Sequence, residues 1–131
     1  MRYNTSLSPR LSETAILATA QIWKAQYEWY AHAPMAEKAG VKPKTIKDIQ
    51  AGRAPASAAK DERAIVDFVR ELYKTRRVSD KTYKRVRAFL DDKGMVELVG
   101  ICGYYAMISM TLNTFRAQLP DDAPVPFTEP A

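Results

Sequence analysis

The chain has 131 residues, 47% of them hydrophobic and 27% charged, and its formal net charge is +5. A chain of this length and composition forms one soluble domain around a single core. The single cysteine, Cys102, excludes an intramolecular disulfide, and its apolar setting predicts a reduced, cytoplasmic protein. The polar first ten residues argue against a signal peptide. The longest apolar run, residues 95–110, contains Glu97 and is shorter than the about 20 residues of a bilayer span, so we expect a buried helix and no membrane anchor.

The positive charge raises the question of an anionic partner. Seven lysine and arginine residues lie between positions 74 and 87. On a helix that begins near Ser79, the basic side chains lie largely on one side and Tyr83, Val86 and Leu90 on the other, which is typical of a solvated amphipathic helix. The cluster therefore favours an ordinary surface over a nucleic-acid site, and any nucleic-acid binding is expected to be weak, non-specific and sensitive to salt.

The N-terminal part of the chain is predicted to be helical. Ser8 followed by Pro9 is a start signal, with the serine hydroxyl as N-cap and proline in the first turn. No glycine or proline interrupts residues 15–33, so helix propensity alone allows one continuous helix there. Pro34 predicts a bend or a restart of the helix, and Gly40 predicts the end of the turns that follow.

Four further helices follow from capping residues and from apolar side chains at helical spacing: residues 44–51, 61–75, 79–90 and 92–119. Strand-like alternation is absent from the sequence. The last segment, residues 120–131, contains four prolines and is predicted to be an extended arm or a disordered end. The chain is thus predicted to be all-α, with five to six helices in one domain over residues 1–120 and a proline-rich arm over residues 121–131.

The helix predicted over residues 92–119 is apolar on every side in its middle, and Gly100 and Gly103 allow close approach of a neighbouring backbone. A helix of this kind must be covered all round. A domain of this size has few helices with which to cover it, so we expect the protein to form a homo-oligomer.

Glu28 and His32 are the most informative pair of residues. They are four positions apart, which on a helix places a carboxylate and an imidazole on one face. Imidazole titrates near neutrality and a carboxylate can orient or recharge it, which suffices for general acid–base catalysis without a metal or cofactor. Glu13 is fifteen residues before Glu28, about 22 Å away on a straight helix. Glu13 can therefore join the site only if the chain turns back between residues 21 and 27.

These residues are spaced as Glu-x11-Ala-x2-Glu-x3-His, from Glu13 through Ala25 and Glu28 to His32. The pattern resembles the AhpD-like and carboxymuconolactone decarboxylase-like superfamily, whose alkylhydroperoxidase branch has cysteines where Ala25 and Glu28 stand here. Without these thiols, the chain is similar to the decarboxylase branch, and the resemblance extends with lower specificity over residues 8–120. It implies an AhpD-like helical bundle that associates into a dimer, trimer or hexamer.

The same resemblance implies a cofactor-independent decarboxylase or proton-transfer enzyme that acts on a small organic acid or lactone, with an anionic substrate favoured. His32 is then the general acid or base, Glu28 its orienting or relay partner, and Glu13 a third member of the site. A peroxidase-related AhpD-like protein that lacks the thiols is one alternative.

A helix-turn-helix protein is the other alternative. Residues 35–53 resemble the DNA-binding unit of the Cro and repressor class, with Gly40 at the turn and with Thr45 and Ile46 opening a recognition helix. Against this reading, Pro34 and the long apolar helix near the C-terminus have no role in so small a domain.

Other reactive groups are less informative. One histidine and one cysteine give no metal-ligand cluster, so no metal site is predicted. Cys102 lies in an apolar helix, where burial would raise its pKa and leave it inert. The aromatic residues beside the Glu-His pair are expected to belong mainly to the core, with one available to line a pocket: Tyr27, Trp29 and Tyr30. Three residues of the long helix are second-tier pocket candidates: Tyr104, Tyr105 and Asn113.

Overall fold

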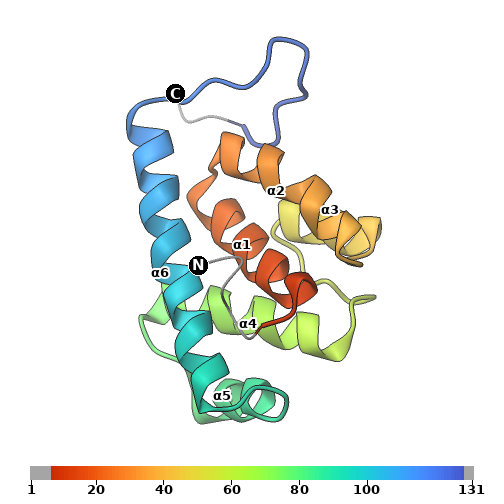
Figure 1. The fold of residues 1–131 in the computed structure, drawn as a ribbon, viewed down its shortest axis with the longest axis vertical. Helices are drawn as coiled ribbons and strands as arrows, with labels where there is room; N and C mark the ends of the chain where they lie inside the picture. The colour runs from red at the N-terminus through yellow and green to blue at the C-terminus, as the bar shows by residue number, and fades with distance from the viewer. Residues whose placement is uncertain (1–6, 129–131) are drawn as a thin grey trace.

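The computed structural model describes residues 7–128, and this part of the chain is all α-helical, without strands (Figure 1). Six helices follow one another, within the predicted range of five to six. Their bounds are α1 Pro9–Trp23, α2 Gln26–Lys38, α3 Pro43–Gln50, α4 Lys60–Thr75, α5 Asp80–Arg87 and α6 Asp92–Thr114.

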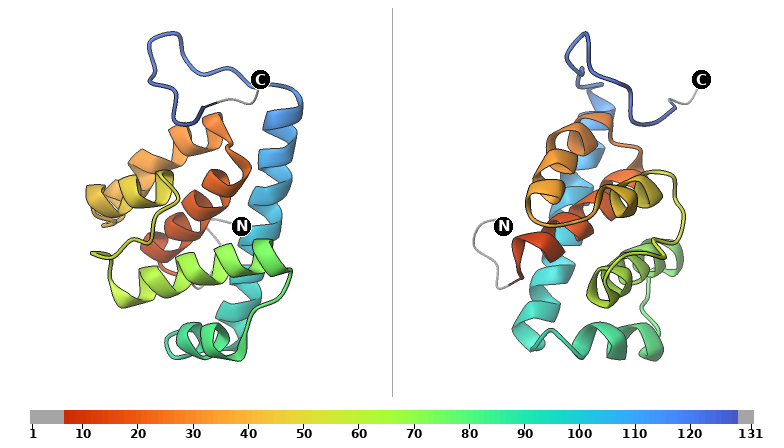
Figure 2. Two further views of the ribbon diagram at one scale, coloured as in Figure 1. Left: turned by 180° about the vertical axis from the view of Figure 1, so that it is seen from behind. Right: turned by 90° about the vertical axis from the view of Figure 1, so that its right-hand side faces the viewer.

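α1 is the central helix of the domain. The Ser8 hydroxyl accepts a hydrogen bond from the backbone N–H of Leu11, and Pro9 occupies the first turn, as predicted. Every residue from Leu11 to Ala20 is buried, because α2, α3, α4 and α6 all pack against this helix (Figures 1 and 2). A polar side chain in this stretch therefore has no access to bulk water and needs a partner inside the protein.

The break between α1 and α2 falls at Lys24 and Ala25, within the predicted range of residues 21–27. Lys24 adopts the left-handed conformation, with φ of 52°, and its backbone N–H bonds to the carbonyls of Ala20 and Gln21. The N–H of Ala25 also bonds to the carbonyl of Ala20, which closes the end of α1. This turn sends α2 back along α1.

Pro34 lies inside α2 and does not make the helix restart. Proline removes one backbone donor, yet the packing of α2 against α1 and α3 keeps the remaining turns helical. Gly40, with φ of 109°, follows the last turn of α2 in a conformation that suits glycine, as predicted.

Two helices are shorter than predicted. α6 ends at Thr114 instead of residue 119, because Arg116 turns into the left-handed region and the N–H of Ala117 bonds to the carbonyl of Leu112. α5 ends at Arg87, because the next residues tighten into turns that bond the N–H groups of Phe89 and Leu90 to Val86. Local capping bonds, which the hydrophobic pattern does not report, decide both ends.

The domain covers α6 on one side only, in agreement with the expectation that a chain of this size has too few helices to surround it. Its opposite side exposes residues three or four positions apart, which form one largely apolar stripe: Val96, Val99, Gly103, Met107 and Met110. By length and composition α6 is the one described helix able to cross a bilayer, a property it shares with many core helices. Here its inner side packs along α1.

We expect the protein to be a dimer or a larger oligomer in solution, because packing a second copy against the exposed stripe of α6 removes apolar surface from water. Light scattering at micromolar concentration measures this state. Val99→Glu combined with Met107→Glu should shift the protein to monomer. Tyr83→Glu, at an exposed aromatic residue of α5, is the control and should not. A stable monomer of the unchanged chain would contradict the expectation.

Candidate functional site

Three side chains from two helices meet between α1 and α2. The imidazole Nδ1 of His32 lies 2.7 Å from Oε1 of Glu13, and its Nε2 lies 2.8 Å from Oε1 of Glu28. Glu28 and His32 share a face of α2 because they are four residues apart. Glu13 comes from α1 and reaches the pair because the chain turns back at Lys24. The structure thus brings together all three residues that the sequence singles out.

The cluster is almost closed to solvent. Glu13 is 3% exposed, Glu28 5% and His32 7%. The ring of Tyr105, from α6, packs edge-on against the imidazole, with 5.4 Å between ring centroids. A pocket beside the pair is expected if one of the neighbouring aromatic residues lines it, but neither of the two best-defined cavities among the described residues contains Glu13, Glu28 or His32 in its lining. Burial of α1 on all sides and the cover from α6 account for the difference.

The two carboxylates control the charge of the imidazole. Burial by itself lowers the pKa of His32, but the hydrogen bonds to Glu13 and Glu28 and their negative charges outweigh burial and raise that pKa to about 9. At neutral pH the imidazole is therefore protonated and donates one N–H to each carboxylate. The cluster then holds one positive and two negative charges.

One acceptor in the cluster is still available. Oε2 of Glu13 is buried and has no hydrogen-bond partner among residues 7–128. A carboxylate oxygen in this state can accept a proton or a hydrogen bond from a hydroxyl group. Chemically, this chain of contacts is able to pass a proton between Glu28, His32 and Glu13, and it ends at a carboxylate oxygen without a partner among residues 7–128.

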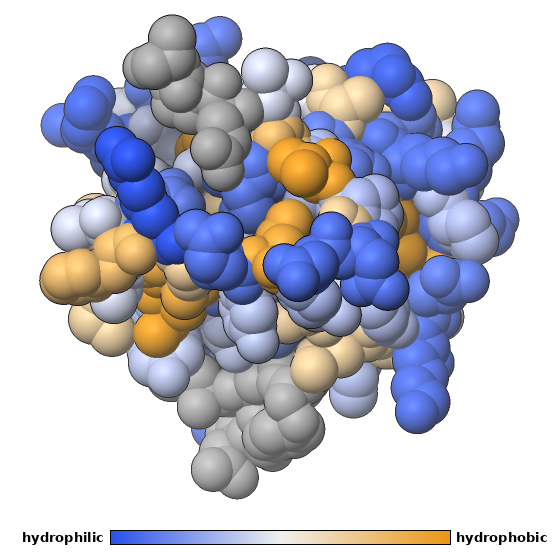
Figure 3. Space-filling model, turned by 90° about the horizontal axis from the view of Figure 1, so that it is seen from above, coloured by the Kyte–Doolittle hydropathy of each residue, from blue (hydrophilic) through white to orange (hydrophobic). Residues whose placement is uncertain are grey.

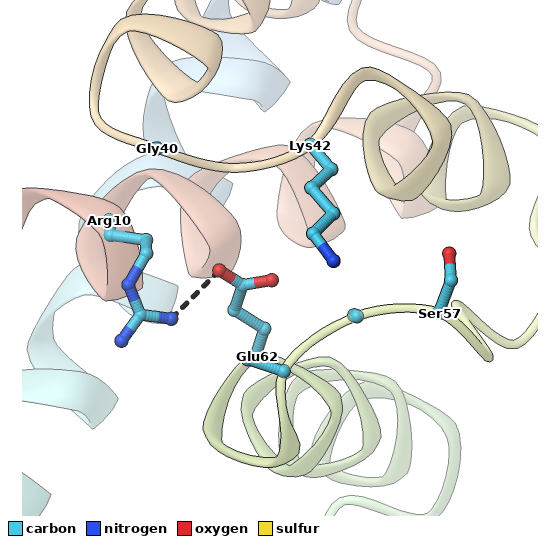
Figure 4. Close-up of a pocket in the computed structure, with 7 residues that line it drawn as sticks. Arg10, Gly40, Lys42, Ser57 and Glu62 are labelled. Atoms are coloured by element: carbon cyan, nitrogen blue, oxygen red, sulfur yellow. Dashed lines mark hydrogen bonds and ion pairs between the residues drawn. The ribbon is translucent and has the colours of Figure 1, made fainter.

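The cavity nearest to Glu13 along α1 has a volume of about 350 Å³ and is lined by charged and polar groups (Figure 4). Arg10, one turn before Glu13 and about 4.5 Å away along the helix axis, lines it and is paired with Asp61 and Glu62. Lys42 points into the cavity and has no ion-pair partner among the described residues. The sequence does not predict this cavity, because its residues come from α1, α4 and two loops.

The structure places the aromatic candidates in different environments. Trp29 is buried, as expected, but Tyr27 and Tyr30 are 42% and 41% exposed, because they lie on the outer side of α2 where no helix covers them. Of the second-tier candidates, Tyr105 touches His32, whereas Tyr104 is largely exposed. Asn113 donates a hydrogen bond to the carbonyl of Trp23, which is not part of the cluster.

Cys102 is buried in the core, and burial raises the pKa of its thiol to about 12. Such a thiol stays protonated at neutral pH and is a poor nucleophile. Within residues 7–128, no group of three His, Cys, Asp or Glu side chains is arranged to hold a metal ion.

The fold and the site together define a class of protein: an all-α domain with a buried Glu-His-Glu cluster on its first two helices. The model of the carboxymuconolactone decarboxylase family matches residues 1–71, more than half of the chain, and the chain belongs to this family. The matched region contains Glu13, Glu28 and His32. No curated protein and no solved structure matches the chain significantly.

Stability should depend on pH through His32. Its folded-state pKa, about 9, is above its ordinary value of 6.5, so the folded protein holds the proton more tightly than the unfolded chain. The resulting stabilisation is complete below about pH 6.5 and is lost as the pH rises through about 9. Urea unfolding between pH 6 and 9.5 should show this fall, and His32→Gln should lack it.

Because the chain has one histidine, NMR can follow the same titration without ambiguity. A midpoint near 6.5 would show that the carboxylates do not hold the proton. Glu13→Gln and Glu28→Gln should each lower the midpoint, whereas Glu37→Gln, at an exposed residue of α2, should not.

Proposed function

We propose that this protein is a cofactor-independent acid–base enzyme that decarboxylates, or transfers a proton within, a small organic acid or lactone. The observation that carries the proposal is the buried cluster in which both imidazole nitrogens of His32 bond to carboxylates. Burial of three ionisable groups destabilises a fold unless they are fully paired. Groups with strongly perturbed pKa values are also enriched in catalytic sites.

In this proposal His32 stores the proton and Glu13 delivers it. For a decarboxylation, the bond between the substrate carbon and its carboxylate breaks, carbon dioxide leaves, and the electron pair on the substrate takes a proton. Both nitrogens of His32 are occupied, so the proton passes along the 2.7 Å contact to Glu13, which meets the substrate. Glu28 orients the imidazole and stabilises its charge, and solvent later returns the proton.

The charge of the surroundings supports an anionic substrate. Lys42 lies in the cavity next to the N-terminal end of α1 without an ion-pair partner among the described residues, and the cavity, at about 350 Å³, is of a size for a small acid. The cluster itself is covered, so a substrate reaches Glu13 when a covering side chain moves aside.

A DNA-binding function has less support. Thr45 and Ile46, which would open the recognition helix, are buried in the domain, as are Asp48 and Ile49 of the same helix. A recognition helix must instead present such residues to the major groove. The fold leaves Lys44 and Lys47 exposed, which suits weak contact with phosphates but no reading of bases.

An aerobic screen of lactones and β-keto acids tests the proposal. With any substrate found, His32→Gln should lower kcat by about 10²-fold to 10⁴-fold, the usual contribution of a general acid or base. Glu13→Gln and Glu28→Gln should lower it by at least about tenfold, since the amide keeps the shape and loses the charge. Glu37→Gln is the control on the same helix. Circular dichroism checks folding, because His32→Gln leaves two buried carboxylates without a counter-ion. A fully active, folded His32→Gln protein would refute the proposal.

The peroxidase-related alternative makes a different prediction. Cys102→Ala should leave any activity unchanged, because one buried thiol with a raised pKa cannot form the thiol couple that peroxide turnover requires. A hydroperoxide assay in parallel with the screen measures this. Activity with hydroperoxide that disappears on Cys102→Ala would favour the alternative.

A further inference from the structure

The chain after α6 folds back onto the start of α2 (Figure 1). Within the described segment 115–128, Phe127 is the only buried residue, at 6% exposure. Its ring packs edge-on against Trp29, with 5.4 Å between centroids, and the Lys24 ammonium lies 5.4 Å from its centroid. An exposed, proline-rich segment is thus held at one aromatic anchor.

The backbone at this anchor is also bonded to side chains of the domain. Gln26 Nε2 donates to the Phe127 carbonyl at 2.6 Å, and the Phe127 N–H donates to Gln26 Oε1 at 2.9 Å. Gln50, on α3, donates to the Pro126 carbonyl at 3.0 Å. An aromatic side chain in a slot together with bonds to the flanking backbone is how folded domains recognise extended peptides. Figure 3, which views this end of the molecule, shows a mainly hydrophilic surface with small groups of hydrophobic residues.

The start of α2 has no side-chain cap. Its N-cap is Ala25, which provides no side chain to bond the first N–H groups, and Pro34 removes a donor later in the helix. Gln26 and Trp29 are three residues apart and lie on one side of α2, and Glu28 and His32 occupy the adjacent side. A contact that holds the first turn therefore also holds the helix that carries the cluster.

We propose that Lys24, Gln26, Trp29 and Gln50 form a peptide-binding slot for a Pro-Phe segment, that the chain's own residues 126–127 occupy it, and that Phe127 is a positioning residue for the Glu28–His32 pair. The binding part stands on the contacts alone. The positioning part rests on the function proposed above.

The test uses the full-length chain with Phe127→Ala, which empties the slot, and a synthetic peptide of residues 120–131 added in trans. The Trp29 indole NMR signal reports the slot. The peptide should bind the variant at least about tenfold more tightly than it binds the unchanged chain, where the tethered segment competes at high effective concentration. The same peptide carrying Phe127→Ala should not bind. Equal binding of the first peptide to both proteins would overturn the slot.

The titration midpoint of His32 and the turnover number report whether Phe127 positions the Glu28–His32 pair. Phe127→Ala should move the His32 midpoint down towards 6.5 and lower kcat about tenfold, and the peptide should restore both. Val125→Ala, at a residue 66% exposed in the same segment, is the control and should change neither. If Phe127→Ala does not fold, Gln50→Ala, which removes only the bond to Pro126, should shift the same signals in the same direction.

The two proposals fail in different ways. An unchanged His32 titration in a variant with an emptied slot would overturn positioning whether or not a substrate is known. Turnover that requires His32 and ignores Phe127→Ala would overturn positioning and leave the proposed function intact. If no substrate is found, the Trp29 and His32 signals still decide the slot and its effect.

Discussion

Two carboxylates buried side by side need a positive charge between them, and this requirement determines how the first two helices pack. Glu13 and Glu28 would repel each other and lose their hydration, at a cost of several kcal/mol. His32 offsets this cost because each of its nitrogens bonds to one carboxylate. The same proton that makes these bonds possible is the one that the proposed reaction uses, so stability and the proposed chemistry depend on a single titration.

This cluster explains why α1 can be central and still carry an acidic residue. Every residue from Leu11 to Ala20 is buried, and the hydroxyls of Thr14 and Thr19 bond to carbonyls one turn earlier in their own helix. Glu13 does not bond to a carbonyl of its own helix in this way, so its hydrogen-bond partner must come from another helix. The family match over residues 1–71 covers both helices of the cluster, α1 and α2.

The C-terminal half completes the environment of the cluster. α6 provides Tyr105 against the imidazole, and its outer side leaves a stripe of apolar residues exposed. The segment after α6 returns to the start of α2, where Phe127 meets Trp29 next to Glu28 in the chain. Two elements remote in sequence thus contact α2 at different turns, one near the cluster and one at the start of the helix.

The sequence by itself determined the all-α fold, five to six helices and the pairing of Glu28 with His32, because helix periodicity and i,i+4 spacing are local. Tertiary structure decided what depends on distant contacts. Lys24 breaks a segment without glycine or proline, and only the packing of α2 against α1 brings His32 to Glu13. The middle of α6 is apolar on every side, so the sequence does not show which of its sides is buried and which is exposed. Phe127 lies in a proline-rich segment with no periodic pattern, so its slot exists only once Trp29 and Gln26 are brought beside it by folding.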